Sequence, residues 1–456
     1  MSRILIIGGS DAGISVSLRA KEVYQQVELT VVVADQYPNF SICGLPFYLS
    51  GEVQDWKTLA HRAAADIENE GIHLLLDHTA TAIDPDKKQV KVVEKNDNSK
   101  NFGYDRLVIG TGAVSVNPDI EGLQLPGVFA LRWMDDSFTM QRFLAEQNPK
   151  SAIIIGAGYI GMEMADSLTY RGLKVTVVEY FDSVLTTVDP EFGNLVRGEL
   201  EKHGVTVNTG IAVEKIEKNE QSLTVIGSKG FSASADMVLV AVGARPETKL
   251  ARAAGIATGI KGAIKVNRRM HTNLPDNYAA GDCVETWHKI LQKYTYLPLR
   301  STAHKQGRVA GENMAGGDAK FQGTLGTQAV KIFNLVAVGT GLRDATAREA
   351  GFDPLTVEIE TWDHKVYYPG AQKMRIRFTG DRINRLILGA QIMGHVSSEV
   401  SKRVDVVATA IFNELKIEDL SDIDLSYTPP LSSPWDPVQL SAQQWLKKRS
   451  NPPLNI

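Results

Sequence analysis

Apolar runs of strand length recur at corresponding places in two parts of the chain. The runs that begin near residues 3 and 151 are each followed by a glycine cluster and then by a stretch with the apolar period of a helix. A second apolar run follows each helix and ends near an acid, at Asp35 in the first part and at Glu179 in the second. This order predicts two α/β units, each with parallel strands.

The remaining apolar pattern adds a third unit. Residues 74–84 and 88–93 have the composition of strands, and the polar residues 94–103 predict a turn. Beyond residue 325 the apolar positions alternate as in antiparallel strands, and helix-period segments follow, which predicts an α+β domain. We expect three domains, formed by residues 1–113 together with 246–322, by residues 114–245, and by residues 323–456.

Composition narrows the class of protein. The 456 residues are 43% hydrophobic and 22% charged, as in soluble globular proteins, and the formal net charge of −4 argues against a dedicated nucleic-acid-binding protein. Two cysteines cannot form a disulfide framework. The sequence shows neither a signal-peptide pattern nor an apolar run long enough to span a membrane. We therefore expect a cytoplasmic protein with no nucleic-acid or membrane partner.

The first glycine cluster, GGSDAG, predicts a phosphate-binding turn. Gly8 suits the tight bend, and Gly13 allows the helix to pack closely on the strand. The middle position, where the backbone approaches a pyrophosphate, is Ser10, which can still donate a hydrogen bond. The phosphates would lie at the N-terminus of the next helix, and Asp35 could accept from ribose hydroxyls.

The second cluster, GAGYIG, has glycine at all three positions, Gly156, Gly158 and Gly161. Glu179 follows at the end of the next strand, and an acid there favours NADH over NADPH because it can bind a free 2′-hydroxyl. Two ordinary tight turns are the alternative interpretation. Because strand, helix and acid accompany both clusters, two dinucleotide sites are the better prediction.

Three later segments, residues 104–113, 239–246 and 277–283, complete a resemblance to the flavoprotein disulfide reductases, the pyridine nucleotide–disulfide oxidoreductase superfamily. The resemblance covers nearly the whole chain. It implies two Rossmann-like domains, which bind FAD (residues 1–113 and 246–322) and NADH (114–245), and a C-terminal dimerisation domain. The implied FAD-binding residues are Gly8, Ser10, Gly13, Asp35, Ser41, Thr111, Gly112, Asp282 and Ala303. The implied NAD-binding residues are Gly156, Gly158, Tyr159, Gly161, Glu163, Glu179 and Gly243.

In this family the tyrosine at position 159 covers the flavin until nicotinamide displaces it, and an acid at position 163 lies near the nicotinamide. A packing aromatic and a surface acid are the alternative roles for Tyr159 and Glu163.

Cys43 is the candidate reactive group. Gly-Leu-Pro follows it, which predicts a helix start, and the position five residues later is Tyr48, where most of the superfamily has a second cysteine. The chain therefore resembles the single-cysteine branch, closest to coenzyme A disulfide reductases and NADH oxidases. A helix N-terminus and an adjacent flavin would lower the pKa of the thiol. A small buried hydrophobe is the alternative role for Cys43, and it is the favoured role for Cys283.

Two tyrosine segments, residues 364–371 and 424–437, resemble those that coenzyme A disulfide reductases place at the dimer interface. There a tyrosine from each segment reaches the partner subunit's cysteine. Tyr427 matches by motif, and Tyr368 is the better match of the pair Tyr367 and Tyr368. The resemblance implies a homodimer with its active site at the interface, although these tyrosines could also serve in interface packing alone.

The resemblance leaves three functional hypotheses. The first is an enzyme that passes electrons from NADH through FAD to Cys43 and on to a small disulfide or persulfide. The second is an NADH oxidase or peroxidase that reduces oxygen or peroxide through a Cys43 sulfenate. The third is an electron-transfer or redox-sensing flavoprotein that docks a protein partner.

Two residues depart from the family pattern near the candidate site. Residue 11 is Asp where the oxidases and peroxidases have a histidine, which weakens the second hypothesis, and residue 42 is Ile where Asn or Ser is common. The histidines His61, His304 and His395 lack ligand spacing on a common helix, so no metal site is expected.

Overall fold

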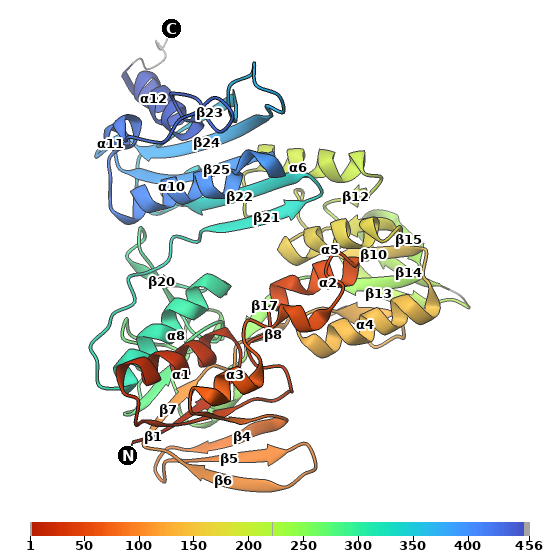
Figure 1. Cartoon of the computed structure of the whole chain (residues 1–456). Helices are drawn as coiled ribbons and strands as arrows, with labels where there is room; N and C mark the ends of the chain where they lie inside the picture. Colours follow the sequence, from red (N-terminus) through yellow and green to blue (C-terminus); the bar gives the residue numbers. More distant parts are fainter. Residues whose placement is uncertain (1, 221, 451–456) are drawn as a thin grey trace.

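Three five-stranded sheets covered by helices form the framework of the protein, seen in a computed structural model that describes residues 2–220 and 222–450 (Figure 1). The first sheet is parallel with the strand order β18-β7-β1-β2-β3, and the second is parallel with the order β12-β11-β10-β16-β9. The third is antiparallel with the order β21-β22-β25-β24-β23. The predicted combination of two α/β units and an α+β unit is confirmed, while the domain boundaries stay a prediction.

The first domain places the glycine turn at the centre of its sheet. Its β1 is a wholly apolar strand after Arg3, pairs with β2 and β7, and leads through the turn into α1, which packs along α8. The parallel sheet comprises β1 (Arg3–Ile7), β2 (Glu28–Val32), β3 (Ile72–Leu75), β7 (Arg106–Ile109) and β18 (Asn277–Ala279). Its helices are α1 (Asp11–Val23), α2 (Leu45–Ser50), α3 (Ala64–Asn69), α7 (Lys249–Ala253) and α8 (Arg300–Met314), and the hairpin of β19 (Thr286–His288) and β20 (Lys293–Thr295) lies beside them.

A separate antiparallel sheet of β4 (His78–Asp84), β5 (Gln89–Glu94) and β6 (Ser99–Gly103) corrects one sequence prediction. The sequence predicts a turn over residues 94–103, whereas only residues 95–98 connect β5 to β6. The strand β6 pairs with β5 at the edge of this sheet, and its side chains are mostly exposed. An edge strand with neither face buried carries no apolar alternation, so the pattern did not reveal it.

The second domain repeats the arrangement of the first. Its parallel sheet and helices are β9 (Val128–Ala130), α4 (Met134–Gln147), β10 (Ser151–Ile155), α5 (Tyr159–Tyr170), β11 (Lys174–Val178), α6 (Pro190–Lys202), β12 (Thr206–Asn208) and β16 (Met237–Val240). A small antiparallel sheet of β13 (Val213–Lys218), β14 (Leu223–Gly227) and β15 (Phe231–Ala235) flanks it. The paired strands β8 (Ala113–Ser115) and β17 (Ala244–Pro246) carry the chain from the first domain and back.

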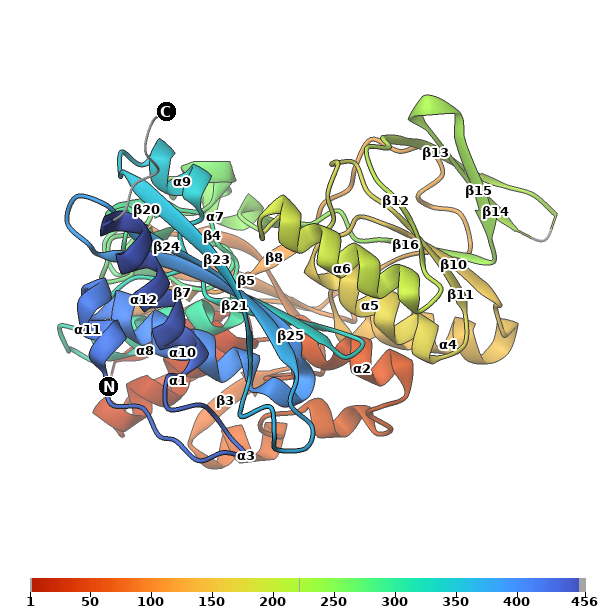
Figure 2. The same ribbon diagram turned by 90° about the horizontal axis from the view of Figure 1, so that it is seen from above.

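The third domain lies against both others. Its strands are β21 (Gln328–Ile332), β22 (Leu335–Gly341), β23 (Pro354–Trp362), β24 (Lys373–Asp381) and β25 (Ile387–His395), and its helices are α9 (Asp344–Glu349), α10 (Val400–Phe412), α11 (Ile417–Asp422) and α12 (Pro437–Ser450). Figure 2 shows the second domain to one side of the other two, with α2 of the first domain next to it. Leu45 and Leu49 of α2 share a hydrophobic cluster with Met162 of α5. None of the helices in the described part of the chain has the length and apolarity needed to cross a membrane.

Candidate active site

A cavity of about 940 Å³ opens at the carboxyl edge of the first sheet. It runs from Asp35 at the end of the β2 strand region to Cys43 near the second domain. The cavity has the size and the position, at the strand ends, of the cofactor-binding cavities in α/β folds. Seven of the predicted FAD residues line it, namely Gly8, Ser10, Asp35, Thr111, Gly112, Asp282 and Ala303. Gly13 and Ser41 are not among the residues that line it.

The first glycine turn is built for close backbone approach. Gly8 has φ +114°, and a Cβ there would come within 2.1 Å of the Gly110 carbonyl oxygen. A Cβ on Gly13 would come within 1.8 Å of the Gly8 carbonyl oxygen, so no other residue lets α1 start this close to β1. The N-terminus of α1 therefore opens directly onto the cavity, where its free amides can bind phosphate.

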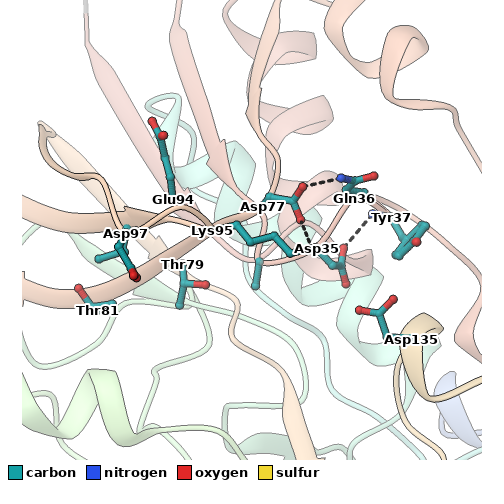
Figure 3. Close-up of a pocket in the computed structure, with 12 residues that line it drawn as sticks. Asp35, Gln36, Tyr37, Asp77, Thr79, Thr81, Glu94, Lys95, Asp97 and Asp135 are labelled. Atoms are coloured by element: carbon teal, nitrogen blue, oxygen red, sulfur yellow. Dashed lines mark hydrogen bonds and ion pairs between the residues drawn. The ribbon is translucent and has the colours of Figure 1, made fainter. Parts of the chain in front are cut away.

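A smaller acidic pocket of about 470 Å³ adjoins the Asp35 end of the cavity (Figure 3). Asp35 accepts a hydrogen bond from the Tyr37 amide at 2.8 Å, and burial raises the pKa of its carboxyl. Asp77 and Asp135 lie beside it. This concentration of carboxylates disfavours phosphate here, so a dinucleotide would direct its ribose to this end and its pyrophosphate to the α1 N-terminus.

Asp282 has a partner that the sequence did not reveal. Its carboxylate accepts a hydrogen bond from the Arg132 guanidinium at 2.8 Å, and both side chains are largely buried. Arg132 comes from the segment just before α4, and it lines the cavity as well. This ion pair closes the cavity wall between the first and second domains.

Cys43 lies in the wall of the cavity, in a short 3-10 turn (Ile42–Gly44) directly before α2. The thiol reaches solvent, although protein atoms surround most of it. Burial raises the pKa of the Cys43 thiol, and the charge of Arg300 acts against that rise. Among the protein groups, the loss of hydration is therefore the largest influence on this pKa, in the direction opposite to the expected lowering.

Arg300, the first residue of α8, is the main cation near this thiol and was not predicted. Its guanidinium donates to Asp11 Oδ1 at 2.6 Å, to the Phe40 carbonyl at 3.0 Å and to Ser41 Oγ at 3.2 Å. These contacts connect α8, α1 and the segment before the cysteine. They place Asp11, one of the two residues that depart from the family pattern, next to Cys43.

The second glycine turn repeats the geometry of the first. Gly156 has φ +104°, and a Cβ on Gly161 would come within 2.0 Å of the Gly156 carbonyl oxygen. By contrast, a Cβ on Gly158 would meet nothing within 4 Å, so this position faces open space. The buried Glu179 carboxylate accepts from the Ala157 amide at 2.6 Å and from the Phe181 amide at 2.9 Å, which ties the acid to the turn.

Two predicted residues, Tyr159 and Glu163, lie on the first turns of α5 and are partly buried. The Tyr159 hydroxyl accepts from Thr187 Oγ1 at 3.0 Å, and burial raises its pKa. Burial also raises the pKa of Glu163 to about 7, with Asp166 adding to the rise and Lys331 opposing it. The charge of Glu163 is felt at Cys43. The structure thus brings Cys43 and Glu163 together.

The three predicted tyrosines lie elsewhere, on the third domain. Tyr367 and Tyr427 are neighbours, and the Lys365 amide donates to the Pro429 carbonyl at 3.3 Å, so the two tyrosine segments are side by side. Tyr367, Tyr368 and Tyr427 are 71%, 43% and 44% exposed. Among the residues that the structure describes, none of the three lines the cavity that holds Cys43.

The other predictions concern residues without a proposed reactive role. Cys283 is fully buried, and burial raises its pKa to about 11, so it packs in the core as favoured. Within residues 2–220 and 222–450, no group of His, Cys, Asp and Glu side chains is arranged to hold a metal ion.

Comparison with known proteins agrees with this geometry. Residues 2–307 match the family described as pyridine nucleotide-disulphide oxidoreductase, and residues 327–437 match its dimerisation domain. A protein of Methanocaldococcus jannaschii named NADH oxidase is 34% identical over 98% of this chain and 100% of its own length. A coenzyme A disulfide reductase of Staphylococcus haemolyticus is 29% identical over 96% of this chain and 98% of its own.

A solved structure has the same fold throughout. The NAD-dependent persulfide reductase of A. fulgidus superposes with a TM-score of 0.94 and 36% identity over 98% of this chain and 84% of that one. From these matches, the chain belongs to the pyridine nucleotide-disulphide oxidoreductase family, whose cofactors are FAD and NAD(P)H.

Proposed function

We propose that the protein is an NADH-dependent flavoenzyme that reduces a small disulfide or persulfide through Cys43. The observation that carries the proposal is the position of this thiol. It is accessible, it lines a cavity suited to a dinucleotide, and the only other cysteine of the chain is fully buried. A disulfide between Cys43 and the buried Cys283 is disfavoured, which supports a small molecule as the source of the second sulfur.

Some residues of the cavity would bind the cofactor, and Cys43 would react with the substrate. Bound FAD would supply two-electron chemistry between a nicotinamide and the thiol. The turn at Gly8 and Ser10 would hold its pyrophosphate, and Asp35 would accept from its ribose. Cys43 would form a mixed disulfide with one sulfur of the substrate, and the departing thiol would take a proton.

We propose NADH rather than NADPH as the electron donor. Glu179 lies at the end of β11 beside the second glycine turn, and the residues after it are Tyr180 and Phe181. A carboxylate at this place accepts from a free 2′-hydroxyl and repels a 2′-phosphate. Gly156, Gly158 and Gly161 would bind the pyrophosphate of NADH, Gly243 would border it, and Tyr159 and Glu163 would lie near the nicotinamide.

The tyrosines support a homodimeric enzyme. Exposed aromatic side chains on a domain that matches a dimerisation family favour burial against a second copy. In that dimer, Tyr427 and Tyr368, with Tyr367 as the alternative to Tyr368, would approach the partner's thiol and donate the proton to the departing thiol. We also propose a cytoplasmic location, because an accessible free thiol persists in a reducing compartment.

The test is NADH consumption by the FAD-loaded enzyme with coenzyme A disulfide, other small disulfides and persulfides, in the absence of air. Wild type and Cys283→Ala are expected to turn over at least one of these substrates. Cys43→Ser is expected to keep its flavin and its reduction by NADH but to lose disulfide turnover. Unchanged disulfide turnover in Cys43→Ser would refute the proposed role of the thiol.

A second candidate function is reduction of oxygen, which the name of the relative from M. jannaschii favours. Under this alternative, NADH is consumed rapidly in air with no disulfide present, and Cys43 cycles through a sulfenate. Asp11, at the position where the oxidases and peroxidases have a histidine, argues against it.

A further inference from the structure

Asp11 and Arg300 form a mostly buried ion pair next to Cys43. The Arg300 guanidinium donates to Asp11 Oδ1 at 2.6 Å, and only 8% of the Asp11 side chain and 19% of the Arg300 side chain are exposed. Both residues line the cavity that contains the thiol. A pair shielded from water in this way keeps much of its electrostatic effect on neighbouring groups.

Arg300 is held in place by more than this carboxylate. It also donates to the Phe40 carbonyl at 3.0 Å and to Ser41 Oγ at 3.2 Å, and these residues directly precede the turn that carries Cys43. Loss of the Asp11 charge would therefore leave the guanidinium anchored on the segment that carries the cysteine.

The charged groups that face Cys43 come from three helices. Arg300 at the start of α8 favours the thiolate, while Glu163 on α5 and Asp11 at the start of α1 oppose it; the effect of Arg300 is the largest of the three and that of Asp11 the smallest. His304 lies one turn along α8, with Nε2 3.3 Å from Asp11 Oδ1. His61 is a further neighbour of this group.

We propose that Asp11 and Arg300 are a charge-tuning pair for Cys43, in which Arg300 stabilises the thiolate and Asp11 limits that stabilisation. Both are positioning residues, because they act on the reactive sulfur through charge. The proposal deepens the proposed function, since it rests on Cys43 being the reactive group.

The balance has a chemical consequence. A thiolate that is stabilised too strongly is a weaker nucleophile, and the best attacking thiol has a pKa near the ambient pH. Burial alone would keep the sulfur protonated, and the guanidinium counters burial in part. The paired carboxylate opposes the guanidinium, so fewer thiols are ionised but each thiolate is the stronger nucleophile, and the departure from the family pattern at residue 11 thereby acquires a role.

The experiment measures the rate at which iodoacetamide alkylates Cys43 in the reduced holoenzyme over a series of pH values, by mass spectrometry of the peptide. Arg300→Gln is expected to raise the midpoint of the alkylation profile by about one pH unit. Asp11→Asn is expected to lower the midpoint, by about half a unit, because the guanidinium remains on Phe40 and Ser41 without its counter-charge. The double variant is expected to fall between the two single variants.

Arg308→Gln is the matched control, because Arg308 lies on the same helix, is exposed and pairs only with Glu22 among the described residues. Its midpoint is expected to equal that of wild type. Flavin content and the far-ultraviolet circular dichroism spectrum check folding, and if Arg300→Gln does not fold, the downward shift in Asp11→Asn decides alone.

A rise of the midpoint in Asp11→Asn would overturn the proposal, because Asp11 would then serve only to anchor Arg300. Equal midpoints in all variants would overturn it as well. Alkylation needs neither NADH nor a disulfide, so these results stand apart from a failure of the proposed function, which would appear only in the turnover assay.

Discussion

Cys43 shows how one side chain can depend on groups that are remote in sequence. The thiol is accessible, yet its surroundings raise its pKa, and the main counteracting charge belongs to a residue 257 positions later. The sequence could identify the cysteine, because its local motif is distinctive. It could not identify Arg300, because the contact exists only once α1 and α8 pack side by side.

Glu163 is the second residue whose environment defines its chemistry. Burial raises its pKa from an ordinary value of 4.5 to about 7, so the folded state favours the protonated carboxyl. The stabilisation from this proton is fully present below the unfolded pKa and is lost as the pH rises through about 7. At about 1.4 kcal/mol per pKa unit, the upper limit is roughly 3 kcal/mol.

We therefore predict that Glu163→Gln flattens the pH dependence of stability between 4.5 and about 7. The measurement is the melting temperature of the holoenzyme at a series of pH values. Wild type should lose melting temperature over this interval more steeply than the variant does, and the exposed Glu146→Gln on α4 should follow wild type. Parallel profiles for wild type and Glu163→Gln would contradict the prediction.

At the scale of elements, two glycines of the second strand–turn–helix unit serve different purposes. Gly161 gives α5 room to start against the Gly156 carbonyl, whereas the space at Gly158 is open. The first is a packing requirement of the protein, and the second is space left for a ligand.

We predict that Gly161→Ala lowers the melting temperature of the holoenzyme, since an added methyl group in this contact costs typically about 1–3 kcal/mol. Gly158→Ala should leave the melting temperature unchanged and raise the KM for NADH by roughly tenfold, which corresponds to about 1.4 kcal/mol of lost binding. Thermal melts and steady-state kinetics on both variants provide the check. An unchanged KM in Gly158→Ala would mean that the pyrophosphate does not approach this position.

The pattern of apolar residues predicts some of the strands but not others. The parallel strands β1, β2, β10 and β11 are buried runs, so their sequences predict them directly. The edge strand β6 is polar and mostly exposed, and nothing in its composition separates it from a turn. The Arg132–Asp282 pair was equally unpredictable, because it joins segments 150 residues apart across two domains.

At the scale of the whole molecule, the second and third domains are joined by a buried polar network. The Arg377 guanidinium donates to Asp189 Oδ2 at 2.9 Å. The Gln391 side chain donates to the same carboxylate at 2.8 Å and accepts from the Asp189 backbone amide at 2.7 Å. A second junction joins Lys331 of β21 to Asp166 of α5 at 2.9 Å, next to Glu163. These contacts hold the second domain, and with it the Tyr159 region, in one position relative to the dimerisation fold.

The proposed dimer predicts that the tyrosines act across the interface. Tyr427→Phe alone should lower disulfide turnover by about 100-fold, the lower end of the usual effect of a positioned proton donor. Co-expressing differently tagged Cys43→Ser and Tyr427→Phe chains, each with little or no activity by itself, should produce a heterodimer with about half the wild-type activity. One of its two symmetry-related sites then contains both groups intact.

The measurement is the turnover of the doubly purified heterodimer with the best small disulfide. A control heterodimer carries both changes on one chain. If Tyr427 acts across the interface, neither of its two sites has both groups intact; if Tyr427 acts within its own chain, one of the two sites does. Inactivity of the mixed heterodimer, or a monomeric mass near 49.9 kDa in solution, would contradict the proposed dimeric site.

The most direct test of the central claim is an anaerobic reductive titration of the oxidised holoenzyme with NADH or dithionite. If Cys43 is a second redox centre beside the flavin, wild type will take up one electron pair for the flavin and a further pair as the small thiol bonded to Cys43 is released. Cys43→Ser will take up the flavin pair alone. Equal electron uptake by wild type and Cys43→Ser would contradict the account.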